Sequence, residues 1–145
     1  MMEKTSLEKK VLSSNEWGLI ALLNEGLIER FQEAAEAIKR EDFEELNKIT
    51  NNCRDILTEL LVTFREKDDL STNLRSLFLY TNTLITEAEI KKDGSYYIEA
   101  IDIIKPLYAG FKSLEMKEKP NIISGLLYGK DDLEEFKQSD KVFEG

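Results

Sequence analysis

The chain has 145 residues, of which 41% are hydrophobic, enough to fill one core, so we expect a single domain over residues 1–145. Its 29 acidic residues outnumber its 20 basic ones, for a net charge of −9, which argues against a protein that binds nucleic acid by neutralising phosphates. No apolar run approaches the ~20 residues of a membrane span, and none follows the charged first residues, so we expect no membrane insertion and a cytoplasmic location.

Histidine is absent, and Cys53 is the single cysteine. The absence of histidine removes the usual general base and the usual zinc ligand. A single thiol forms neither an internal disulfide nor a thiolate metal site, and the acidic pair Asp131–Asp132 does not continue into a calcium-loop pattern. We therefore expect no enzyme, no cofactor and no metal; an enzyme that uses lysine and carboxylate groups in a bundle pocket is the alternative.

Periodic apolar residues predict four helices. The first is expected to begin at a cap among Ser13, Ser14 and Asn15, and the second at Asp42, with Glu45 three residues later. The short joint between them makes the two helices antiparallel. Their core-facing stripes are Leu19, Leu22, Leu23, Gly26, Leu27, Phe31, Ala34 and Ile38, then Phe43, Leu46, Ile49, Cys53, Ile56, Leu57, Leu60 and Phe64.

The third helix is expected to be capped by Asp69 or Ser71 and to end before Gly94, which suits a left-handed position after a helix. Ser95 is the expected cap of the fourth helix. The stripes are Leu70, Leu74, Leu77, Phe78, Thr81, Leu84, Ile85 and Ala88, then Tyr97, Ile101, Ile104, Tyr108 and Phe111.

These elements predict an all-α protein, an antiparallel four-helix bundle over about 13–117 with a C-terminal extension over about 118–145. Residues 121–129 are apolar but interrupted by glycine, and we expect a strap or a short helix docked on the bundle. The remaining tail, 130–145, is acidic.

The helices carry more apolar residues than one core face requires. The surplus residues are Ile20, Val62, Leu79, Tyr80, Ile98 and Ile103. Such a surplus means either a thicker core or a binding groove, and with no catalytic groups it favours a protein that binds another protein. A homodimer seam is a further interpretation of the same stripe.

Three stretches carry a family resemblance: Leu-Ile-Ala-Leu-Leu-Asn-Glu-Gly-Leu-Ile over 19–28, Asp-Ile-Leu-Thr-Glu-Leu over 55–60, and Asn-Leu-Arg-Ser-Leu-Phe-Leu-Tyr over 73–80. Across roughly 13–114 the chain resembles the flagellin secretion chaperones of the FliS family. It departs from them at Asn24, where the family has Tyr, and it lacks the family's N-terminal Tyr and Gln motif. Two further departures are Glu89 in place of Asn and Phe111 in place of a common Trp.

The resemblance implies a cytoplasmic export chaperone that binds the C-terminal segment of flagellin, prevents premature polymerisation and assists type III flagellar secretion, with the export apparatus as a further partner. The alternative is a diverged four-helix bundle with a different cytoplasmic protein client. We expect the client to lie along the second, third and fourth helices, and residues 121–128 to occupy that surface in the unbound protein. The candidate contacts are Asn52, Ile56, Asn73, Leu74, Leu77, Tyr80, Ile103 and Tyr108, with Asn52 and Asn73 as polar anchors.

Overall fold

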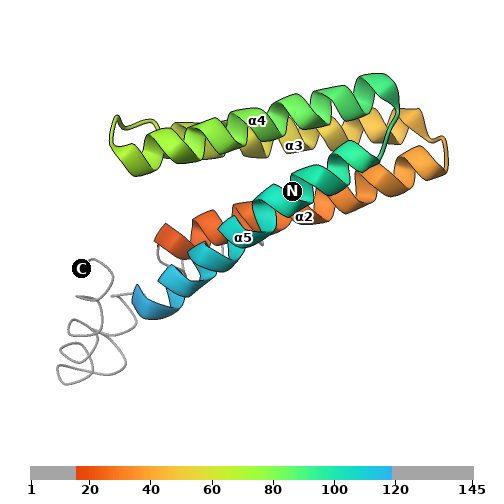
Figure 1. The fold of residues 1–145 in the computed structure, drawn as a ribbon. Helices are drawn as coiled ribbons and strands as arrows, with labels where there is room; N and C mark the ends of the chain where they lie inside the picture. The colour runs from red at the N-terminus through yellow and green to blue at the C-terminus, as the bar shows by residue number, and fades with distance from the viewer. Residues whose placement is uncertain (1–15, 119–145) are drawn as a thin grey trace. The chain divides into compact units, whose positions relative to one another are not determined.

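A computed structural model describes residues 16–118, which form four helices and contain no strand. They are α2 (Glu16–Lys39), α3 (Phe43–Thr63), α4 (Asp69–Lys91) and α5 (Ser95–Glu118) (Figure 1). The all-α prediction is therefore confirmed. The expected cap at 13–15 and the expected docking of 121–129 lie outside the described residues. No helix in the described range is long and apolar enough to cross a membrane.

The described residues fall into two compact units, and the larger comprises residues 23–107. It contains α3 and α4, which lie side by side in Figure 1, with the later part of α2 and the first part of α5. The rings of Phe64 and Phe78 are 6.2 Å apart and join α3 to α4, while Phe31 and Tyr97, 6.1 Å apart, join α2 to α5. The helices packed in this unit agree with the predicted fold class, a four-helix bundle.

Most of the core of the larger unit follows the predicted stripes, because residues three and four positions apart share one helix face. Phe43 and Leu77 were predicted to face the core as well, but they are 41% and 38% exposed, so that part of the prediction was wrong. Cys53 is buried there, as expected. Thr50, Thr81 and Asn24 are also fully buried. The largest fully buried apolar side chains are Leu27, Phe31, Leu46, Leu57, Leu60, Phe78, Ile85, Tyr97 and Ile104.

The smaller unit comprises, among described residues, 16–22 of α2 and 108–118 of α5. The rings of Trp17 and Phe111 stack with centroids 6.0 Å apart and planes 13° from parallel. Ile20 is buried, so of the two interpretations given for the surplus apolar residues it fits the thicker core. Its position one residue after Leu19 placed it beside the expected stripe, but Leu19 is only half-buried.

The joint between α2 and α3 confirms the predicted cap. The carboxylate of Asp42 accepts a hydrogen bond from the Glu45 backbone N–H at 3.2 Å. Asp42 and Glu41 donate their own N–H groups to the carbonyls of Ala37 and Ile38, both at 2.9 Å. This pair of bonds is a Schellman motif, and it holds Glu41 in the left-handed region with φ of 57°.

The joint between α4 and α5 corrects two predictions. Lys92, not Gly94, is the left-handed residue, with φ of 55°, because the Asp93 N–H reaches back to the Ala88 carbonyl at 3.1 Å and closes the helix there. Ser95 is the first residue of α5 rather than its cap. Its hydroxyl and N–H donate to the Asp93 carboxylate at 2.7 and 2.9 Å, and they lower the pKa of Asp93.

The joint between α3 and α4 places the helix cap before both predicted caps, Asp69 and Ser71, which lie inside α4. Asp68 is the N-cap, and its carboxylate accepts the Ser71 N–H at 2.7 Å. That bond lowers the pKa of Asp68, since it stabilises the ionised carboxylate. Arg75 donates to the carbonyl of Phe64, so the guanidinium satisfies the end of α3.

Candidate functional site

Helix α4 presents one apolar face to solvent. Leu77 is 38% exposed and Tyr80 is 48% exposed, and Asn73 is exposed one turn earlier. These three residues are spaced four and three positions apart, so they lie on one face of the helix. Large apolar side chains that cluster on such a face are typical of a protein-binding surface.

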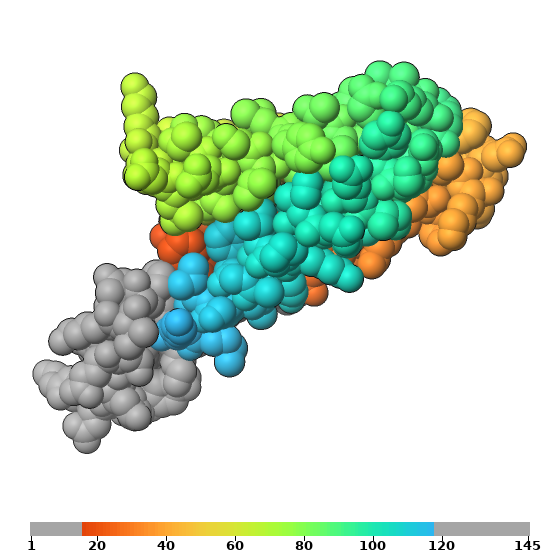
Figure 2. Space-filling model, in the orientation of Figure 1, coloured from red at the N-terminus to blue at the C-terminus, as the bar shows by residue number. Residues whose placement is uncertain are grey.

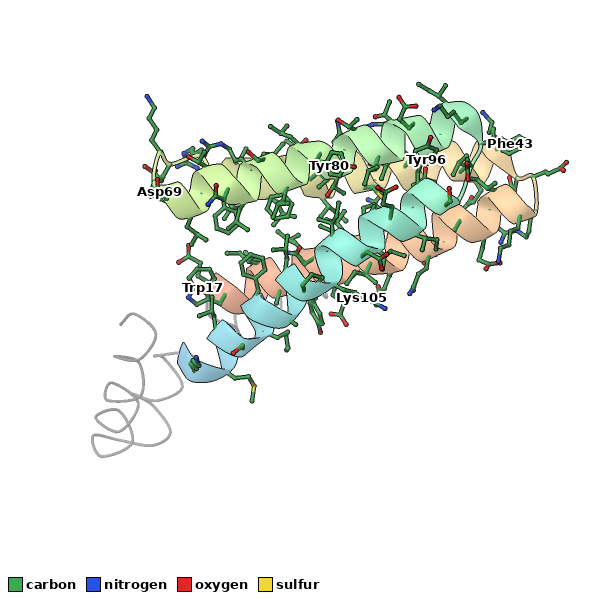
Figure 3. The ribbon with its side chains drawn as sticks, viewed as in Figure 1. Trp17, Phe43, Asp69, Tyr80, Tyr96 and Lys105 are labelled. Carbon is green, nitrogen blue, oxygen red and sulfur yellow. The ribbon has the colours of Figure 1, made fainter. Side chains whose placement is uncertain are left out.

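Helix α5 lies beside this face. The Tyr80 hydroxyl donates to the Glu99 carboxylate at 3.4 Å, which brings the two helices together at that level. Figure 3 labels Tyr80 on α4. Ile103, half-buried, lies one turn further along α5 on the Glu99 face. We call Asn73, Leu77, Tyr80, Glu99 and Ile103 the α4–α5 patch. Figure 2 shows α4 and the first part of α5 together on the face in view.

The structure thus gathers four of the eight predicted contact residues, Asn73, Leu77, Tyr80 and Ile103. The other four lie elsewhere. Leu74 is only 5% exposed, because the turn of the helix carries the residue after Asn73 into the core. The remaining three are Asn52, exposed on α3; Ile56, half-buried on α3; and Tyr108, half-buried in the smaller unit.

Most of the surplus apolar residues are exposed to solvent. Val62, Leu79 and Ile98 are exposed, as is Tyr80. Leu70 is exposed too, although the expected core stripe included it. The buried stripe of α4 instead begins at Ser71, which the Asp68 cap turns inward.

A polar cluster on the α3–α4 seam was not foreseen. Arg54 lies 3.1 Å from the Glu89 carboxylate and donates to the Thr86 hydroxyl at 3.3 Å. Asn47 donates to the other Glu89 oxygen at 2.8 Å. The carboxylate at position 89 therefore accepts from two residues of α3 and holds the register of the two helices.

The interior groups are unsuited to catalysis. Burial raises the pKa of the Cys53 thiol to about 12, so the thiol stays protonated and unreactive near neutral pH. Burial also raises the pKa of Tyr97 to about 12, and its hydroxyl lies 2.6 Å from that of Thr50. Both groups act in packing and hydrogen bonding rather than in proton transfer.

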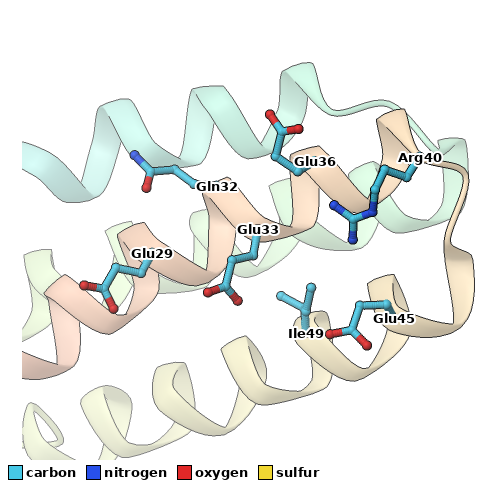
Figure 4. Close-up of a pocket in the computed structure, with 7 residues that line it drawn as sticks. All are labelled: Glu29, Gln32, Glu33, Glu36, Arg40, Glu45 and Ile49. Atoms are coloured by element: carbon cyan, nitrogen blue, oxygen red, sulfur yellow. The ribbon is translucent and has the colours of Figure 1, made fainter.

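A pocket between α2 and α3 has an acidic lining (Figure 4). Its residues are Glu29, Gln32, Glu33, Glu36, Arg40, Glu45 and Ile49. Two of the carboxylates pair on their own helix, Glu33 with Arg30 at 3.1 Å and Glu36 with Lys39 at 3.5 Å. Within the part of the chain that the structure describes, no group of three or more acidic or thiol side chains could hold a metal ion.

Comparison with known families gives one match. The family model described as Flagellar protein FliS matches residues 2–118. No curated protein matches the chain. The family match ends at the last residue of α5, so 119–145 lie beyond it.

Proposed function

We propose, since this chain belongs to the FliS family of flagellar proteins, that it is a cytoplasmic chaperone for flagellin. FliS proteins have a flagellar export chaperone role, and the chain has four helices packed against each other, consistent with that family. In the proposed function the chain binds the C-terminal segment of flagellin, prevents premature polymerisation and presents the client to the type III export apparatus.

The observation that carries the proposal is the α4–α5 patch. A client segment that is disordered as a monomer loses conformational freedom on binding, so the complex must bury apolar area to offset that cost. Leu77 and Tyr80 stand exposed on a helix whose opposite face is buried against the core. A rigid support lowers the ordering cost on the chaperone side.

The proposed roles follow from the chemistry of each side chain. Leu77, Tyr80 and Ile103 supply apolar area, and the exposed amides of Asn73 and Asn52 hydrogen-bond the client backbone. Ile56 on α3 and Tyr108 in the smaller unit are proposed as further client contacts outside the patch. Leu74 lies in the core, so we propose that it supports α4 from beneath.

Calorimetry with the C-terminal segment of flagellin tests the proposal. We expect 1:1 binding with a negative heat-capacity change, because apolar surface is buried. Leu77→Ala and Tyr80→Ala should each weaken binding about 10-fold or more, as central apolar anchors do. Leu79→Ala is the matched control, since Leu79 is 53% exposed on the same helix but outside the patch.

Each failure has a distinct meaning. Unchanged affinity in both patch variants, with native circular dichroism, would contradict the placement of the client. No binding to any flagellin segment would contradict flagellin as the client and favour the diverged bundle with another protein partner. Sedimentation that shows a dimer blocked by Tyr80→Ala would assign the patch to self-association.

The departures from the family pattern bear on this choice. Asn24 is fully buried, and Phe111 is buried with its ring stacked on Trp17. Glu89 accepts hydrogen bonds from Arg54 and Asn47. These three departures therefore alter internal packing and the α3–α4 seam, and they leave the α4–α5 patch untouched.

A further inference from the structure

Tyr80 and Glu99 join the two helices of the α4–α5 patch. The phenol of Tyr80, on α4, donates to the carboxylate of Glu99, on α5, at 3.4 Å, and both side chains are exposed. We propose that this pair selects clients that place a lysine or an arginine against it, beside apolar residues that contact Leu77 and Ile103. The inference rests on the proposed function, because it concerns what the same surface recognises in its client.

Glu99 carries a negative charge that no lysine or arginine within residues 16–118 neutralises in an ion pair. The positions three and four residues away on the same helix face hold no cation either; they are Ser95, Tyr96, Asp102 and Ile103. Asp102 adds a second exposed carboxylate one turn further along α5. This part of the patch is therefore anionic as well as apolar.

The basic residues of the two helices in the larger unit are directed elsewhere. Between 69 and 90 the basic residue of α4 is Arg75, which donates to the carbonyls of Phe64 and Glu66. Lys105 follows Glu99 by six positions, which places it about 120° away around α5. A client that covers Glu99 must then supply the cation itself, because a carboxylate is costly to bury without a partner.

Another carboxylate and phenol of this chain already bind a cation. The Lys91 ammonium lies 3.1 Å from the Glu87 carboxylate, 3.0 Å from the Tyr96 hydroxyl and 5.2 Å from the centroid of the Tyr96 ring. The hydrogen bonds with Tyr96 and Glu87 raise the pKa of Lys91, so both stabilise the charged ammonium. Tyr80 and Glu99 present the same two chemical groups, again one from α4 and one from α5, to solvent.

A lysine or an arginine suits this pair better than a neutral residue does. The carboxylate attracts the cation, the ring of Tyr80 offers it an aromatic face, and its aliphatic stem adds apolar contact with Leu77. An acidic residue of the client at this place would be repelled by Glu99 and Asp102. The pair therefore determines specificity, whereas Leu77 and Ile103 supply apolar area.

Calorimetry of the full-length chain with the flagellin segment tests the selection. Glu99→Gln keeps the shape of the side chain and removes its charge, so the affinity should fall ~10-fold, and Glu99→Lys should lower it further through repulsion. Added salt should weaken binding to the unaltered chain more than binding to Glu99→Gln, because salt screens the charge pair. Glu66→Gln is the matched control, since it makes the same change of charge at an exposed joint residue outside the patch, and it should change the affinity less than ~2-fold.

A double-mutant cycle then identifies the client residue. Each lysine and arginine of the flagellin segment is replaced in turn by glutamine. One replacement should weaken binding to the unaltered chain ~10-fold but binding to Glu99→Gln less than ~2-fold, since the charge pair is already broken there. Unchanged affinity in Glu99→Gln, with native circular dichroism, would overturn the selection and leave flagellin as the client.

A probe without flagellin separates the selection from the proposed function. Two synthetic peptides of leucine, alanine and serine, which differ in one central arginine or glutamine, are titrated into the isotope-labelled chain while the amide NMR signals of α4 and α5 are followed. The arginine peptide should bind at least ~5 times more tightly, and Glu99→Gln should abolish that preference. This result with no binding of any flagellin segment would support the selection and contradict flagellin as the client. Equal binding of the two peptides would overturn the selection.

Discussion

Two tyrosines of the larger unit show how differently its interior and its surface use one residue type. Tyr97 is fully buried, with its ring against Phe31 and its hydroxyl 2.6 Å from that of Thr50. Tyr80 is 48% exposed, and its hydroxyl reaches Glu99 at 3.4 Å.

The contrast separates folding from binding. The contacts of Tyr97 are complete within the chain, so changes there should act on stability. Tyr80 keeps half of its area available, so changes there should act on association. Matched substitutions at buried and at exposed positions therefore test whether the interior determines stability and the surface determines binding.

The largest expected effect is at the interior ring pair. Phe31→Ala removes a fully buried ring and leaves a cavity, so we expect the free energy of unfolding to fall by about 3–5 kcal/mol in a urea titration. Leu79→Ala, at an exposed position, should change it by less than about 1 kcal/mol. Comparable losses of stability at Phe31 and Leu79 would contradict the division between a stabilising interior and a binding surface.

The second largest effect is expected from removing the hydroxyl groups of the two tyrosines, which should differ in how much stability they contribute. Tyr97→Phe leaves the buried Thr50 hydroxyl without its partner, which should cost about 1–3 kcal/mol of stability. Tyr80→Phe should cost less than about 0.5 kcal/mol, because water replaces its exposed hydrogen bond. Combining Thr50→Val with Tyr97→Phe should recover part of the loss, and a double-mutant cycle measures that coupling.

Alkaline pH should lower the free energy of unfolding, because two buried groups then lose their protons. The pKa values of Cys53 and Tyr97 are raised in the folded state, each to about 12, so the folded chain retains protons that the unfolded chain releases. Stability from this source is full below about pH 9 and is lost as the pH rises toward 12.

We expect a loss of about 1–2 kcal/mol between pH 7 and pH 10, measured as the urea midpoint at each pH. Cys53→Ala should make the dependence shallower, since only Tyr97 then remains. An unchanged slope in that variant would assign the pH dependence to other groups.

The smallest expected effect is a gain in stability from glycine substitutions at the joints between helices. Glu41 and Lys92 adopt left-handed backbone conformations that glycine adopts at lower cost. Glu41→Gly should therefore raise the melting temperature by an amount equivalent to about 1 kcal/mol. Lys92→Gly should gain less, because Lys92 also donates to the Glu89 carbonyl at 3.2 Å and its ammonium lies 5.1 Å from the Phe43 ring centroid.

Local patterns predicted most of the fold. Asp42 was identified as a cap because its carboxylate needs only a backbone N–H three residues away. Gly94 was chosen as the left-handed residue because glycine has the highest preference for it, whereas the backbone bond from Asp93 to Ala88 assigns that conformation to Lys92. Local preference is weaker than the geometry of the closing hydrogen bonds.

The candidate site was predicted only in part, because one position along a helix turns a side chain by about 100°. Asn73 and Leu77 were placed on a surface that the structure confirms as exposed, yet Leu74 between them is buried. Pairs such as Arg54 with Glu89 depend on two helices meeting in one register. A single sequence carries no signal for that register across 35 positions.

The ring pair of Phe31 and Tyr97 also has a consequence for folding kinetics. Their contact spans 66 positions of the chain, whereas the Phe64–Phe78 contact spans 14. Closing the longer loop costs more chain entropy, so the α3–α4 hairpin is expected to form early in the transition state, before α2 and α5 join. Substitutions at Phe78 should then slow refolding, whereas those at Tyr97 should chiefly accelerate unfolding.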